Sequence, residues 1–144
     1  MAIDRRYGNE AAERQLGFCQ CARVGDLVFI SGAVSWDENF QPLHKGDMGA
    51  QIDQIYRNLT AALQQFDLTF DDVVKETGFT TDMDATLGAL GARAKYYASG
   101  LLPAATWVEV SRLVNPDLLL EIELIASARK EGAERAQPLL GRNE

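Results

Sequence analysis

The stretch LLLEIELIASA, residues 118–128, alternates as a β-strand does and is apolar on both of its faces. One face consists of Leu118, Leu120, Ile122 and Leu124, and the other of Leu119, Glu121, Glu123 and Ile125. A sheet buries an apolar face by packing another layer on it, and the helices of a short chain suffice for one face only. We therefore expect the face that carries the two glutamates to meet another protein surface.

The other predicted strands follow from alternation, β-branched residues and turn signals. They cover Leu16–Val24, Leu27–Gly32, a short strand within Ala33–Gly46, Val73–Thr81 and Leu102–Leu113. Within the last of these, Trp107 is interpreted as an aromatic residue that anchors an interface. The strand order, interrupted by two helices, predicts an α+β fold with about six strands and the helices on one face.

Two helices are predicted between the strands. The first is capped by Asp47 and has an apolar stripe at spacings of three and four, formed by Ile52, Ile55, Tyr56, Leu59, Leu63 and Phe66. The second is capped by Asp82 or Asp84, directs Leu87, Leu90, Ala94 and Tyr97 inward and ends at Gly100.

Length and charge limit the classes of function. The 144 residues suit one domain, predicted at residues 1–128 with a polar C-terminal tail at 129–144. The formal net charge is −7, without a run of basic residues, so nucleic acid and membrane partners are not expected and a small-molecule ligand is. Since no apolar run reaches the length of a membrane span, we expect a cytoplasmic protein.

The residues that usually hold metals are few. The only cysteines are Cys19 and Cys21, and the only histidine is His44. These three residues do not complete a tetrahedral site, so we expect no metal, and the sequence indicates no cofactor. The two cysteines are predicted to be reduced thiols.

Several ordered motifs resemble the Rid family, also called the YjgF/YER057c/UK114 family. They are VGDLVFISG, DMGAQ followed by NL, DDVVKETGFTTDM, VEVSRL and LEIELIA, and together they extend from about Phe18 to Ala126. The resemblance implies the chorismate-mutase-like (YjgF-like) fold, with a mixed six-stranded sheet, two helices on one face and a homotrimer that has three clefts between its subunits.

The family's best-studied branch hydrolyses reactive 2-imino acids, or their enamine tautomers, to 2-keto acids and ammonia. Its members bind the substrate carboxylate with an arginine in a Pro-Ala-Arg-Ser-type stretch. The corresponding residues here are Pro103, Ala104, Ala105 and Thr106, so Ala105 stands where the arginine would be. Alanine offers no donors to a carboxylate, and the resemblance therefore implies a divergent member whose substrate is not an ordinary 2-imino acid.

Other family positions imply the rest of the site. Phe18 takes the place of a cleft tyrosine, Ser31 and Gly32 are retained, and Glu121 matches the cleft glutamate. Trp107, close after Ala105, would narrow the cleft. Glu121 is the candidate catalytic residue because a carboxyl group among apolar residues has a raised pKa and can transfer protons. Phe18, Ser31, Gly32, Ala105 and Trp107 are the candidate substrate-binding residues.

Three functions remain open at this point. The first is an enamine or imine hydrolase, whose substrate either lacks a carboxylate or presents it to Arg23 or Arg93 of a neighbouring subunit. The second is a trimer that binds a small metabolite without turning it over, and the third is a chaperone-like interaction protein. Glu121 would be a solvated or salt-bridged acid if the cleft were not catalytic.

Overall fold

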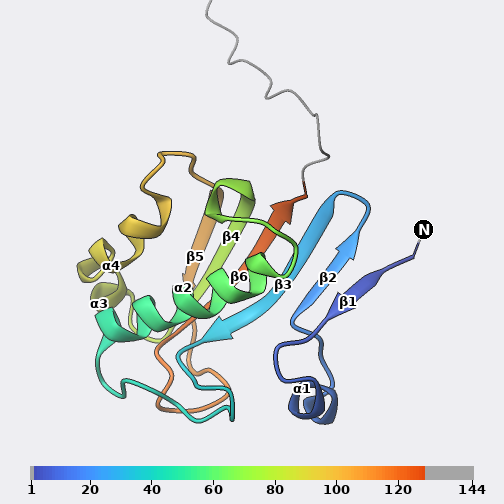
Figure 1. Ribbon diagram of the computed structural model, residues 1–144. Helices are drawn as coiled ribbons and strands as arrows, with labels where there is room; N and C mark the ends of the chain where they lie inside the picture. The colour runs from blue at the N-terminus through green and yellow to red at the C-terminus, as the bar shows by residue number, and fades with distance from the viewer. Residues whose placement is uncertain (1, 129–144) are drawn as a thin grey trace, which may run out of the picture.

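The computed structural model describes residues 2–128, which form strands and helices (Figure 1). The predicted tail, residues 129–144, lies outside the described residues. The strands are β1 (Asp4–Arg6), β2 (Cys21–Val24), β3 (Leu27–Val34), β4 (Val73–Thr80), β5 (Ala104–Glu109) and β6 (Leu120–Ser127). The helices are α1 (Glu10–Leu16), α2 (Met48–Gln64), α3 (Met83–Gly88) and α4 (Gly91–Ala94), with 3₁₀ turns at Phe70–Asp72 and Lys95–Tyr97.

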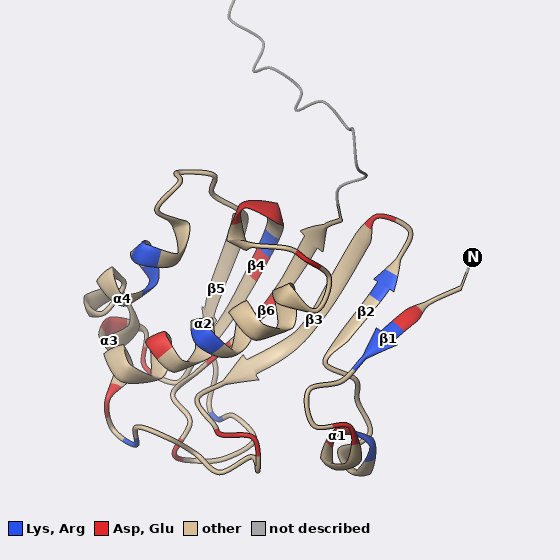
Figure 2. Cartoon of the chain, viewed as in Figure 1, with Lys and Arg blue, Asp and Glu red and all other residues tan. Residues whose placement is uncertain are grey.

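The six strands form one mixed sheet in the order β1-β2-β3-β6-β4-β5. All neighbouring pairs are antiparallel except β4 and β5, which are parallel and are joined by the segment that contains α3 and α4. Strand β3 carries no charged residue and lies beside β6 near the centre of the sheet (Figure 2). This is the predicted α+β fold with its helical layer on one face.

Helix α2 forms as its apolar periodicity predicts. The Asp47 side chain accepts a hydrogen bond from the Ala50 N–H and so caps the first turn. All six residues of the predicted stripe are buried, and they pack with the inward residues of β3 and β6 into the main core. The helix lies across the sheet (Figure 1).

The second predicted helix is broken into shorter pieces. Asp82 is the N-cap, but α3 ends at Gly88 and α4 begins at Gly91, since glycine is a poor helix former. Tyr97 is buried as predicted, whereas Leu87 and Ala94 are exposed, so the inward face assigned to this segment was wrong in these two positions.

The N-terminal prediction was wrong for residues 16–20. Instead of one strand from Leu16, helix α1 runs to Leu16 and β2 begins only at Cys21. The Asn9 side chain accepts from the Ala12 N–H at the start of α1, and Gly17 ends the helix with φ at 89°. The short strand expected within Ala33–Gly46 is reduced to an isolated bridge between Trp36 and Pro42.

The sheet face opposite α2 is partly exposed. Glu121, Glu123 and Ile125 alternate with the buried residues of β6 on this face, as predicted. Phe29 and Val108, on β3 and β5, are exposed. A small second cluster of Val34, Leu113 and Leu118 covers only part of the face. None of the described helices is long and apolar enough to cross a membrane.

Candidate functional site

Four of the predicted site residues lie together in one cavity. Phe18, Ser31, Gly32 and Glu121 line a space of about 320 Å³. The other lining residues are mostly apolar: Leu16, Val34, Trp36 and Val114. The cavity therefore combines one carboxyl group with an apolar wall, which is the usual composition of a small-molecule site.

Glu121 supplies the acidic group of this cavity. It lies in β6 between Val34 of β3 and Phe79 of β4 in the sheet register. Burial raises the pKa of its carboxyl group above the ordinary value, and the negative charge of Glu123 raises it further. A carboxyl group in such surroundings can hold a proton nearer to neutral pH and release it again.

Gly32 makes room for that carboxyl group. A β-carbon at position 32 would lie 2.8 Å from Glu121 Cδ and would overlap Oε1. The register of β3 with β6 shifts between Ile30 and Ala33, so Gly32 lies within a bulge. Bulges often redirect side chains next to functional sites, and here the bulge and the missing side chain together admit Glu121.

Ser31 is placed in the cavity with its donors already used. Its hydroxyl group donates to the Cys19 carbonyl oxygen at 2.7 Å, and its backbone N–H donates to the Gln20 carbonyl oxygen at 2.9 Å. The hydroxyl oxygen keeps its capacity to accept. Ser31 therefore suits a water molecule or an N–H group of a ligand better than a ligand carbonyl.

Ala105 and Trp107 lie elsewhere in the subunit. Both are in β5, two strands from β6, and their register partners in β4 are Glu76 and Gly78. The Trp107 indole N–H donates to the buried Glu76 carboxylate at 3.1 Å, on the face that α2 covers. These two residues and Glu121 thus occupy opposite faces of the sheet, and within one subunit neither of them lines the Glu121 cavity.

The sequence did not indicate the cluster around Glu76. This fully buried carboxylate accepts from the hydroxyl groups of Tyr56 and Tyr97 at 2.8 Å and 2.7 Å. The Arg93 guanidinium binds it through Nε and Nη2 at 3.0 Å and 3.3 Å, and lies over the rings of Tyr97 and Trp107. Burial raises the pKa values of the two tyrosine hydroxyl groups, and the nearby negative charge of Glu76 raises them further.

Neither arginine considered as a substitute anchor is free within its subunit. Arg93 is bound to Glu76, as described above. Arg23 donates to the Gly25 carbonyl oxygen at 2.9 Å and lies 3.9 Å from an Asp26 carboxylate oxygen. Binding a substrate carboxylate through either residue would compete with these contacts.

The Cys21 thiol shows no sign of activation. Cys21 is buried, and burial raises the pKa of its thiol to about 12, so it is not a thiolate near neutral pH. Across residues 2–128, no three His, Cys, Asp or Glu side chains are grouped as metal ligands would be.

Comparison with known proteins agrees with this fold. The sequence model of the family described as Endoribonuclease L-PSP matches residues 9–128. A RutC family protein of Pyrococcus horikoshii is 34% identical over 118 residues, which cover 81% of this chain and 92% of that protein. The mouse 2-iminobutanoate/2-iminopropanoate deaminase is 31% identical over 109 residues, 76% of this chain and 79% of that protein.

Solved structures give the same assignment. YyfA of Yersinia pestis, described as a member of the conserved Rid family, superposes with a TM-score of 0.79 at 27% identity, over 88% of this chain and 99% of that one. A YjgF/YER057c/UK114 family member of Mycobacterium tuberculosis superposes with a TM-score of 0.74 at 26% identity, with the same coverage. From the family match and the shared fold, the chain belongs to the Rid (YjgF/YER057c/UK114) family.

Proposed function

We propose that this protein hydrolyses a reactive enamine or imine metabolite, with Glu121 as the proton-transferring residue. The observation that carries the proposal is the cavity in which the Glu121 carboxyl group, with its raised pKa, lies against Gly32 and near Ser31 and Phe18. The mouse relative is named as a deaminase of two 2-imino acids, which supports the class of reaction.

Glu121 can serve both halves of such a reaction. In its acid form it protonates the imine nitrogen, and as a carboxylate it takes a proton from the water that attacks the carbon. The resulting carbinolamine loses ammonia when its nitrogen is protonated and its hydroxyl proton is removed. The C=N bond is replaced by C=O, one water is consumed and no oxidant is needed. For an enamine, protonation at carbon first gives the iminium ion.

We propose that the substrate has no carboxylate that an arginine side chain must bind. Ala105 provides no hydrogen-bond donor. Arg93 is already bound to the Glu76 carboxylate, which is fully buried. The apolar lining of the Glu121 cavity favours a neutral or weakly polar substrate body.

The complete site is proposed to lie between subunits of a homotrimer. Glu121 and Ala105 lie on opposite faces of one sheet, so Ala105 can approach Glu121 only from a neighbouring copy. The exposed Phe29 and Val108 on the Glu121 face would be covered by such an assembly. The ligand is proposed to be a small molecule, and the formal net charge of −7 gives no support for RNA binding despite the family's description.

The test is ammonia release from imines generated in situ by amino acid or amine oxidases. Carboxylated and non-carboxylated imines are compared for the wild-type protein, Glu121→Gln and Glu123→Gln. We expect turnover above background for non-carboxylated imines and its loss in Glu121→Gln. Glu123→Gln should keep turnover, with its pH profile displaced to lower pH because Glu123 raises the pKa of Glu121.

Two results would oppose the proposal. Turnover that persists in Glu121→Gln would remove Glu121 from the chemistry. An absence of turnover for every imine, in protein that remains folded and assembled, would favour the alternative in which the trimer binds a metabolite without converting it.

A further inference from the structure

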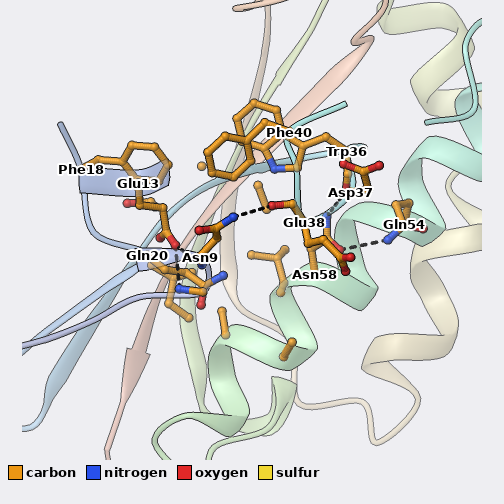
Figure 3. Close-up of a pocket in the computed structure, with 18 of the residues that line it drawn as sticks. Asn9, Glu13, Phe18, Gln20, Trp36, Asp37, Glu38, Phe40, Gln54 and Asn58 are labelled. Carbon is orange, nitrogen blue, oxygen red and sulfur yellow. Dashed lines mark hydrogen bonds between the residues drawn. The ribbon is translucent and has the colours of Figure 1, made fainter. Parts of the chain in front are cut away.

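A second and larger cavity lies within one subunit, on the α2 side of the sheet (Figure 3). Its volume is about 410 Å³, within the range of small-molecule pockets. It is bounded by α1 with the residues before it, by residues 30–33 of β3, by the loop from Trp36 to Phe40 and by α2. Glu13, which does not line the Glu121 cavity, distinguishes the two cavities.

The wall of this cavity contains a buried carboxyl group with an unused oxygen. Glu13, in α1, is only 3% exposed. Its Oε2 accepts from the backbone N–H groups of Gly8 and Asn9 at 2.7 Å and 2.5 Å. Its Oε1 is buried and has no hydrogen-bond partner among the described residues. Such a group is costly to leave unsatisfied, and a ligand that donates to it would remove the cost.

Aromatic rings form another part of the wall. Trp36 and Phe40 are stacked, with ring centroids 4.5 Å apart and planes inclined by 30°. Phe18 lies 6.3 Å from Phe40, centroid to centroid. Figure 3 shows Trp36 and Phe40 above Asn58, with Phe18 to the left beside Glu13. Faces of aromatic rings attract flat apolar groups and organic cations.

The charges around the cavity are of one sign. Glu13, Asp37 and Glu38 line it, and the described lining residues include no lysine or arginine. Asn58 and Gln54 complete the polar part: Asn58 accepts from Gln54 at 3.0 Å and donates to the carbonyl oxygens of Val34 and Trp36. An anionic ligand would face carboxylates without a compensating cation.

We propose that this cavity binds a small flat organic cation, such as an amidinium or a protonated aromatic amine. The cation donates to Glu13 Oε1, and its flat body packs against the rings of Trp36 and Phe40. Glu121 does not line this cavity, although Phe18, Ser31, Gly32 and Trp36 line both cavities, so the two adjoin.

The test uses benzamidine, benzamide and benzoate as cationic, neutral and anionic probes of nearly one shape. Calorimetric titration of the full-length protein should show saturable binding of benzamidine, weaker binding of benzamide and none of benzoate. Equal affinities for the three probes, or no saturation by benzamidine at concentrations on the order of 10 mM, would overturn the proposal.

Single-residue variants test whether benzamidine binds in this cavity. Glu13→Gln should weaken the affinity for benzamidine about tenfold or more, which is the scale of a lost charged hydrogen bond. The affinity for benzamide should be nearly unaffected. Glu10→Gln is the matched control, since Glu10 is on the same helix but pairs with Arg14 at an exposed position. If Glu13→Gln does not fold, Phe40→Leu provides the second variant, which should lose affinity for benzamidine.

One further control separates this site from the Glu121 cavity. Glu121→Gln should leave benzamidine affinity unchanged while it abolishes imine turnover. A loss of benzamidine binding in Glu121→Gln, with Glu13→Gln unaffected, would place the cation in the other cavity and contradict the proposal.

Discussion

The space that a side chain would need at Gly32 is occupied by the Glu121 carboxyl group, whose Cδ would be 2.8 Å from a β-carbon at that position. The glycine in the bulge of β3 and the glutamate of β6 are thus one structural unit. A residue without chemistry of its own determines where the candidate catalytic group lies.

Gly32→Ala should therefore reduce imine turnover nearly as much as Glu121→Ala does. The atom that must move is the end of a flexible side chain, so the free energy of unfolding should change by no more than about 1 kcal/mol. The double variant should be no worse than Glu121→Ala alone. Gly88→Ala, at which a β-carbon meets nothing within 4 Å, is the control and should keep full activity.

The pH dependence of stability should report on Glu121. Burial raises its pKa in the folded protein above 4.5, so the folded state binds this proton more tightly than the unfolded chain does. The contribution of Glu121 to the free energy of unfolding is therefore largest below its pKa in the unfolded chain. This contribution is lost as the pH rises through its pKa in the folded protein.

Glu121→Gln lacks this titration. Chemical denaturation should show the variant more stable than the wild-type protein near neutral pH, with the difference shrinking toward pH 4.5. A difference that grows on acidification would contradict a raised pKa.

Arg93→Met should be strongly destabilising. It leaves the fully buried Glu76 carboxylate without its counter-charge, and breaking a buried pair in this way typically costs about 3–5 kcal/mol. Arg57→Met removes the exposed guanidinium that pairs with Asp53 and should cost less than about 1 kcal/mol. Urea unfolding of both variants measures the contrast, and equal effects would show that Glu76 does not depend on Arg93.

Ala105→Arg should bring turnover of carboxylated 2-imino acids, because it restores a guanidinium in the strand proposed to face a neighbour's Glu121. Ala104→Arg is the matched control: it is also exposed, is adjacent in β5 and points to the other face. A gain in both variants would indicate a general charge effect. No gain in a folded Ala105→Arg protein would mean that the missing tyrosine hydroxyl at Phe18 or the cleft shape matters more.

Local patterns in the sequence predicted the central elements well. The six-residue stripe and the Asp47 cap predicted α2, and the alternation around Glu121 predicted the two faces of β6. Helix α1 was missed although Asn9 and Gly17 mark its two ends. Its seven residues are too few to show a clear helical periodicity, and strand-like residues follow directly.

The Glu76 cluster could not be found in this way. Its five side chains come from α2, β4, α4 with the following turn, and β5, and only the fold brings them together. A glutamate in a strand is ordinarily expected at the surface, so its burial depends on partners that no local pattern identifies. The same holds for Gly32, whose role follows from a contact across two strands.

The two edge strands of the sheet differ in their charged residues, and this difference affects where the protein could aggregate. At one border, β1 has the sequence Asp-Arg-Arg, and such charged residues discourage pairing with another strand. At the other, β5 offers five uncharged residues, Ala104–Val108, before Glu109. If the proposed trimer covers this border, its dissociation would expose a strand that pairs readily with foreign strands. Dilution or damage to the interface would then lead to aggregation rather than to a stable monomer.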